Sequence, residues 1–284
     1  MDARDSSPLV TALVPTYNGS RFIQRTLDSL AAQTWSNLEI LIGDDRSTDD
    51  TLDIVRRFAE QHPNVRIVER ESNLGWLGNS NDLMARARGG LMFFAFHDDV
   101  VAPTYVERLA EALLANDRAV LAFSDMNVHE VGGPGRLHVF DELEGLRSSV
   151  ERGRVMVRRP GNWWVPNRGL FRSSAYRAVG GIHPNEQGEY SADWTWLLGL
   201  SLIGEFVRVP ELLCEKYYTA GSLSKRWPHD ETQLLALRRS GIAEIRRSSL
   251  GPLAKARLTG HLWRRVVGRR LPGWVKRIFR RLGL

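Results

Sequence analysis

The sequence predicts an α/β fold in which a mostly parallel sheet is flanked by helices and followed by a C-terminal helical segment. Three observations predict it. Short apolar runs alternate with amphipathic stretches as far as Phe96, an order typical of strand and helix units around a parallel sheet. Polar clusters follow the ends of the apolar runs. Residues from about His229 onward have the pattern of helices alone.

The first part of the chain contains four apolar runs that we interpret as strands, at residues 9–15, 38–45, 65–70 and 91–96. Apolar residues recur at steps of three and four between them, which predicts helices at residues 20–34, 48–62 and 75–89. The polar clusters PTYNG, DDRSTDD and HDD each follow a strand end. Because ligands of open α/β sheets bind at the carboxyl edge of the strands, we expect these clusters to line one cleft.

The alternation is looser beyond Pro103. Helices are predicted at residues 105–116, 173–181 and 192–204, and a strand at 119–125. Residues 128–160 are rich in Gly, Arg and turn formers, which indicates an irregular hairpin or a flexible loop. Residues 205–218 predict two short strands broken by Pro210.

The composition is that of a globular protein, with 43% hydrophobic and 25% charged residues. The single Cys214 excludes an intramolecular disulfide framework. No apolar run approaches the roughly 18 residues of a spanning helix, and no leader precedes Pro8. We therefore expect a protein that is not integral to a membrane and works in a reducing compartment, the cytoplasm.

The net charge of +6 comes from the C-terminal tail. Residues 260–284 hold eight Arg and Lys and no acidic residue, whereas the rest of the chain has 31 basic and 33 acidic side chains. Helical spacing would gather the apolar side chains of the tail on one face, flanked by cations, as in helices that lie in a membrane interface. We expect either binding to the inner, anionic face of a membrane or packing of this face on the rest of the chain.

Two adjacent aspartates, Asp98 and Asp99, follow the apolar run that ends at Phe96. Neighbouring carboxylates repel and raise the pKa of one another, so their pairing needs a reason. Acidic residues before a proline often only form a turn or cap a helix. Alternatively, they hold a hard divalent cation, since Mg²⁺ is typically bound by one or two carboxylates and substrate phosphates.

Four segments resemble, in order and spacing, the family-two inverting glycosyltransferases of the A-type, Rossmann-like fold: LVPTYNGSRFIQRTLDSLAAQT, LEILIGDDRSTDDT, NLGWLGNSND and GGLMFFAFHDD. The similarity covers roughly residues 8–225. It implies a catalytic domain over residues 1–228, with a donor half at about 8–125 and an acceptor half at about 126–228, before a helical extension over 229–284. It also implies a nucleotide-diphosphate sugar as donor, a glycan or lipid-linked acceptor, and a role in glycan or cell-surface polysaccharide assembly.

The resemblance also implies roles for residues of the donor half. Pro15 and Tyr17 would frame the nucleotide base, and Asp45 would accept a hydrogen bond from it. Asn73 and Asn81 would line the donor site, although either could equally cap a helix.

The resemblance resolves the question of the paired aspartates in favour of a ligand. Asp98 would contact the ribose or the water shell of the metal, and Asp99 would bind the Mg²⁺ or Mn²⁺ that bridges the two phosphates. An inverting transferase also needs a general base, which the family places at a helix start after a glycine-rich turn; here that residue is Asp193. The usual Glu-Asp pair is replaced by Ala192 and Asp193, which leaves Glu189 as a rival base.

Other side chains admit two interpretations. Trp194, Trp196 and the tryptophans of NWWVPNRG could stack on sugar rings or pack in the core. Lys225 and Arg226 lie where the closing loop of the family could bring cations to the diphosphate.

Two other function classes are disfavoured. A sugar-phosphate nucleotidyltransferase would need a glycine-rich basic loop after the first strand, and PTYNGSR is poor in glycine. A nucleic-acid-binding protein that used the basic tail would need a recognisable nucleic-acid module, and none is present. We therefore expect no nucleic-acid partner.

Overall fold

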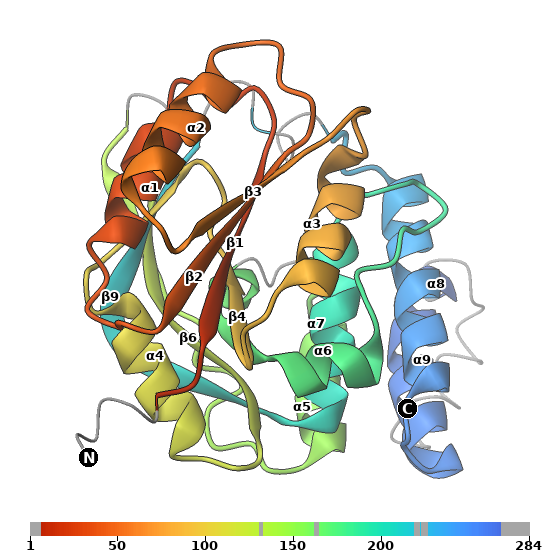
Figure 1. Ribbon diagram of the computed structural model, residues 1–284. Helices are drawn as coiled ribbons and strands as arrows, with labels where there is room; N and C mark the ends of the chain where they lie inside the picture. Colours follow the sequence, from red (N-terminus) through yellow and green to blue (C-terminus); the bar gives the residue numbers. More distant parts are fainter. Residues whose placement is uncertain (1–6, 131–132, 162–164, 219–221, 223–226, 268–284) are drawn as a thin grey trace.

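The computed structural model describes residues 7–130, 133–161, 165–218, 222 and 227–267. Its sheet has the strand order β3-β2-β1-β4-β8-β6-β9-β5, with β7 beside β6 (Figure 1). The strands are β1 (Val10–Thr16), β2 (Leu38–Asp44), β3 (Val65–Glu69), β4 (Leu91–Phe94), β5 (Asp99–Val101), β6 (Ala119–His129), β7 (Gly135–His138), β8 (Leu170–Arg172) and β9 (Glu205–Tyr217). The predicted α/β fold with helices around a sheet is confirmed.

The first half is a parallel sheet between helices. Strand β1 pairs in parallel with β2 and β4, and β2 pairs in parallel with β3. The sequence predicts these strands within one or two residues, because β1, β2 and β4 are continuous buried runs. Helices α1 (Ile23–Ala31) and α2 (Thr51–Gln61) lie on one side of the sheet, and α3 (Gly75–Arg86) lies on the other (Figure 1).

The second half is mixed. Strand β8 is antiparallel to β4 and β6, β9 is parallel to β6, and β5 is antiparallel to β9. Helix α4 (Tyr105–Leu114) precedes β6, and α6 (Ser173–Val179) and α7 (Ala192–Ile203) follow β8. The prediction of two strands broken by Pro210 is wrong, because β9 is continuous. The register between β9 and β6 shifts between Ser124 and Asp125. Pro210 has no backbone N–H to donate to a neighbouring strand, and this irregular stretch of β9 accommodates it.

Residues 128–160 contain a helix that the sequence analysis missed. The hairpin is present, since β7 pairs antiparallel with β6, but α5 (Ser149–Arg158) follows it. The Ser148 hydroxyl accepts from the Glu151 N–H at 3.4 Å, so the pattern Ser-x-x-Glu marked this helix start. Gly153 made the helical pattern hard to recognise in the sequence. A Cβ at this position would lie 2.8 Å from side chains of Leu202 and Leu258, so glycine is what allows α5 to pack closely against these residues.

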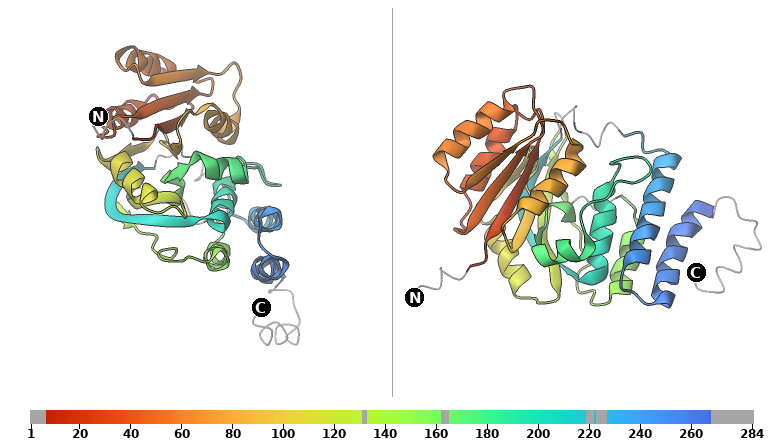
Figure 2. Two further views of the ribbon diagram at one scale, coloured as in Figure 1. Left: turned by 60° about the horizontal axis from the view of Figure 1, so that its bottom comes forward. Right: turned by 45° about the vertical axis from the view of Figure 1, so that its right-hand side comes forward.

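Two C-terminal helices, α8 (Glu231–Arg247) and α9 (Pro252–Val267), pack against α7 and α5 (Figure 2). Small residues bring α7 and α8 together: a Cβ on Gly199 would lie 2.5 Å from Glu244, and one on Gly241 would lie 2.7 Å from Trp194. The expected C-terminal helices are therefore present as far as Val267, the last residue that the structure describes, and α8 packs against α7. No helix within the described residues is both long and apolar enough to cross a membrane.

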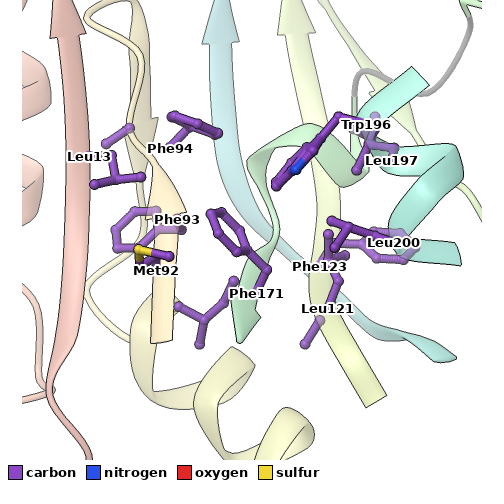
Figure 3. Close-up of a cluster of buried hydrophobic side chains, with 14 of the residues drawn as sticks. Leu13, Met92, Phe93, Phe94, Leu121, Phe123, Phe171, Trp196, Leu197 and Leu200 are labelled. Carbon is purple, nitrogen blue, oxygen red and sulfur yellow. The ribbon is translucent and has the colours of Figure 1, made fainter. Parts of the chain in front are cut away.

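Aromatic side chains fill the core between the sheet and α7. The rings of Phe94, Phe171 and Trp196 pack against one another (Figure 3). Their centroids are 6.0 Å apart for Phe94 and Phe171, 5.0 Å for Phe171 and Trp196, and 6.1 Å for Phe94 and Trp196. Trp194 and Trp196 are both buried. Of the two interpretations of these tryptophans, the structure supports core packing; the predicted sugar contacts of residues 163 and 164 lie outside the described residues.

Candidate active site

The first polar group of the site follows β2. Asp45 is buried, its Oδ1 accepts from the Leu74 N–H at 2.8 Å, and its backbone carbonyl accepts from Nδ2 of Asn73 at 3.0 Å. Burial raises the pKa of Asp45, against the hydrogen bonds from Leu74 and Gly75. Tyr17, just beyond β1, is 46% exposed, so its ring is open to a ligand. Asp45 and Asn73 are thus in contact, and Tyr17 follows the neighbouring strand β1 at the same carboxyl edge of the sheet, as expected.

Asn81 forms a contact that the sequence did not reveal. Its Nδ2 donates to the carbonyl of Ile182 and its Oδ1 accepts from the N–H of the same residue, both at 2.8 Å. The amide therefore fastens α3 to the segment before α7. This contact joins the two halves of the molecule, and the predicted role of Asn81 in donor binding stays a prediction.

Four charged side chains meet where β4 ends and β5 begins. Arg168 lies in the 3₁₀ turn η2 (Pro166–Arg168), and its Nε donates to Oδ2 of Asp99 at 2.8 Å. Nζ of Lys216, on β9, lies 3.4 Å from Oδ2 of Asp98 and 3.5 Å from Oδ1 of Asp99. Asp99 is 2% exposed, whereas the side chain of Asp98 is 16% exposed. Asp98 is therefore the more open of the two carboxylates.

In this group, neighbouring opposite charges offset the effect of burial on the pKa values. Burial acts to raise the pKa of Asp98, but Lys216, His97 and Arg168 hold it below its ordinary value. Burial likewise acts to lower the pKa of Arg168, but Asp99 and Asp98 keep it raised. The Arg168 guanidinium also lies 4.5 Å above the ring of Phe96. Both aspartates are thus paired with cationic side chains of the protein.

Asp193 occupies the first turn of α7, after a sharp turn at Ser191, which has φ 45°. Its Oδ2 accepts from Nδ2 of Asn167 at 3.0 Å. Burial raises the pKa of Asp193, against the charge of Arg168 and backbone N–H groups. A carboxylate with a raised pKa is a stronger base, as proton transfer requires.

The rival base, Glu189, is engaged elsewhere. Its Oε1 accepts from the Leu77 N–H at 3.1 Å, at the N-terminus of α3. Gly75 makes room for it, since a Cβ there would lie 2.5 Å from the same oxygen and the backbone has φ +74°. Burial and the neighbouring charge of Asp45 raise the pKa of Glu189. The geometry therefore favours a role for Glu189 in holding α3.

Three residues that the sequence analysis missed complete the site. Asn167 and Arg168 are adjacent in η2, yet one bonds Asp193 and the other Asp99, so a single turn joins the two carboxylates. Lys216 lies opposite Asp99 in the antiparallel pairing of β5 and β9. One feature of the sequence could have revealed Lys216. It lies two residues after Cys214 on the same predicted strand, so both side chains point to the same face of the sheet, and Cys214 is buried. Lys225 and Arg226 lie outside the described residues.

Comparisons with known proteins identify the family. The family model described as Glycosyl transferase family 2 matches residues 11–168, more than half of the chain. The chain belongs to glycosyl transferase family 2. It is therefore an enzyme of the glycosyltransferase class, as the motifs implied.

Individual relatives of the family agree with this assignment. The chain is 35% identical over 199 residues to the chondroitin synthase of Pasteurella multocida (strain Pm70), which covers 70% of this chain but only 19% of the synthase. The fold is similar to that of S. aureus TarS (residues 1–349, in complex with UDP-GlcNAc), with a TM-score of 0.71 and 18% identity over 92% of this chain and 73% of TarS. The fold is also similar to that of the mannosyltransferase PcManGT from Pyrobaculum calidifontis, in complex with GDP-Man and Mn²⁺. The TM-score is 0.58 and the identity 16%, and the match covers 99% of this chain and 81% of PcManGT. These structures confirm the A-type fold.

Proposed function

We propose that this family 2 enzyme transfers a sugar from a nucleoside-diphosphate sugar to a hydroxyl acceptor, with inversion at the anomeric carbon and with the help of Mg²⁺ or Mn²⁺. The observation that carries the proposal is the continuous set of contacts from Asp99 through Arg168 and Asn167 to Asp193. These contacts link the carboxylate that would bind the cation to the carboxylate that would accept the proton, which supports the proposal. The ligands named for TarS, UDP-GlcNAc, and for PcManGT, GDP-Man and Mn²⁺, support the same donor class.

The residues present fit a divalent cation. Asp98 and Asp99 offer hard carboxylate oxygens, and Asp98 is the more exposed. Among the residues that the structure describes, no group of three or more His, Cys, Asp or Glu could hold a metal by itself. Phosphate oxygens and water would therefore complete the coordination, as is usual for Mg²⁺. A bound cation would neutralise the diphosphate as it leaves.

Asp193 would act as the general base. It would take the proton of the acceptor hydroxyl while that oxygen attacks the anomeric carbon from the face opposite the diphosphate. The hydrogen bond from Asn167 would help to orient this carboxylate toward the acceptor. The catalytic domain of residues 1–228 would thus bind the donor over its first half and the acceptor over its second.

The donor base would lie against Tyr17, Pro15 and Asp45, with Asn73 bracing the Asp45 loop. The acceptor would be a glycan or a lipid-linked sugar at the inner face of a membrane. Two large apolar side chains of α9 support membrane association, since Leu253 is 65% and Trp263 41% exposed. The predicted basic helix of residues 268–284 lies outside the described residues.

A panel of nucleotide sugars tests the proposal. The enzyme is incubated with UDP- and GDP-sugars and Mn²⁺ or EDTA, with water as a slow acceptor, and the released sugar is followed by ¹H NMR. We expect Mn²⁺-dependent release of a nucleoside diphosphate from one donor class, with the inverted anomer formed first. Release of the retained anomer would contradict inversion, and equal rates in EDTA would contradict the metal. Incorporation of a nucleotide into sugar phosphates would favour the nucleotidyltransferase alternative.

A further inference from the structure

Lys216 is a buried cation for which the proposed reaction has so far no role. It lies on β9, in register with Asp99 of β5, and is 6% exposed. Its ammonium contacts both aspartates at 3.4 and 3.5 Å and lies 4.9 Å from the centroid of the Tyr218 ring. Burial of an ammonium is costly unless it is paired, and here the partners are the two carboxylates expected to face a metal.

The charge balance of the group makes this position important. Asp98 and Asp99 carry two negative charges, and Arg168 and Lys216 carry two positive charges. Arg168 is bound to Oδ2 of Asp99, on the oxygen away from Lys216. Lys216 contacts both carboxylates. A divalent cation that used Oδ2 of Asp98 or Oδ1 of Asp99 would have to share or replace this contact.

We propose that Lys216 is the resident counter-cation of the Asp98–Asp99 pair: it competes with the divalent cation for the carboxylates and keeps metal affinity low until a nucleoside diphosphate supplies further negative charge. The proposal rests on the proposed metal-assisted transfer. If these carboxylates held a divalent cation, the Lys216 ammonium would be free to pair with the negative charge of the nucleotide instead. Lys216 would thus make metal binding depend on the donor.

Two affinities measured on the full chain distinguish this role from a structural one. Lys216→Met keeps an unbranched side chain of similar size but removes the charge. We expect Mn²⁺ to bind this variant at least about tenfold more tightly than the native chain in the absence of nucleotide, because a repelling charge a few ångströms away is gone. We expect UDP, or GDP if the enzyme prefers it, to bind about tenfold more weakly without metal. A lysine that only supports the fold would not move the two affinities in opposite directions.

Lys255→Met is the matched control, since Nζ of Lys255 donates to the Arg246 carbonyl on the helical pair α8–α9, and both affinities should stay native. Isothermal titration with MnCl₂ and with the nucleotide supplies the values. If Lys216→Met does not fold, Lys216→Gln keeps a donor for the carboxylates, and Mn²⁺ should raise its Tm more than that of the native chain.

The outcomes separate the two proposals. Native or weaker Mn²⁺ affinity in a folded Lys216 variant, with Mn²⁺ bound normally by the native chain and UDP, overturns the role of Lys216 alone. If the native chain does not bind Mn²⁺ with either nucleotide while the Lys216 variants bind it, Lys216 competes with the metal, but both the donor dependence assigned to Lys216 and the metal dependence of the transfer are overturned. Absence of Mn²⁺ binding in every variant overturns both.

Discussion

Replacement of Asn167 by Leu should shift the pH dependence of turnover. Asn167 is 5% exposed, and its Nδ2 donates to Asp193 at 3.0 Å, which favours the ionised carboxylate. A hydrogen bond to a charged group contributes about 1.5–3 kcal/mol, and one pKa unit corresponds to about 1.36 kcal/mol. Because Asp193 is partly exposed, solvent weakens the effect, and we expect the lower end, about one pH unit.

The sign follows from the role of Asp193 as base. Burial already raises its pKa, and loss of the hydrogen bond raises it further, so the acid limb of the kcat profile moves to higher pH. Leu keeps the branching of Asn at Cγ and suits a buried position. Asn64→Leu, which removes a hydrogen bond to the Leu38 carbonyl far from the site, is the control. An unmoved acid limb in a folded Asn167→Leu variant would refute the reasoning.

Three further changes test other parts of the site. Asp193→Asn should preserve donor affinity by titration and lower turnover by roughly 10²–10⁴, the usual contribution of a positioned base; surviving turnover would make Glu189 the better candidate. Asp99→Asn should weaken Mn²⁺-dependent nucleotide binding and lower the free energy of unfolding by about 3–5 kcal/mol, because buried Arg168 loses its anion; unchanged values in titration and denaturant melts would count against both roles. Residues 268–284 hold six basic side chains, each contributing roughly 1 kcal/mol at an anionic surface. Their removal should abolish sedimentation with anionic liposomes at low salt, while hydrolysis of the donor persists. Equal sedimentation of the full and the shortened chain would exclude the membrane role.

The sequence predicts the parts of the site that depend on local pattern. Asp45 and Asp98 follow buried parallel strands, so their position at one edge could be inferred from periodicity and strand order alone. Asp193 could be found from the helix start and the family resemblance. Helix α5 could also have been found, since Ser148 and Glu151 have capping-box spacing.

The contacts that complete the site depend on pairings that are distant in the sequence. Lys216 reaches Asp99 only because β9 returns antiparallel to β5, 117 residues later in the chain. Arg168 reaches the same carboxylate through a short 3₁₀ turn that no periodicity reveals. Pro210 misled the analysis because an irregular register in β9 accommodates a residue that usually ends a strand. Long-range strand pairing, rather than local propensity, thus decides which charges meet.

A crystal structure with Mn²⁺ and a nucleoside diphosphate, determined once with UDP and once with GDP, tests the central claim most directly. With the nucleotide that binds, the account predicts an anomalous manganese peak at about 2.0–2.2 Å from a carboxylate oxygen of Asp98 or Asp99, typical of a hard divalent cation. It also predicts the base against Tyr17 and Asp45. A manganese ion and nucleotide bound away from these residues, or no binding of either nucleotide at saturating concentration, would contradict the account.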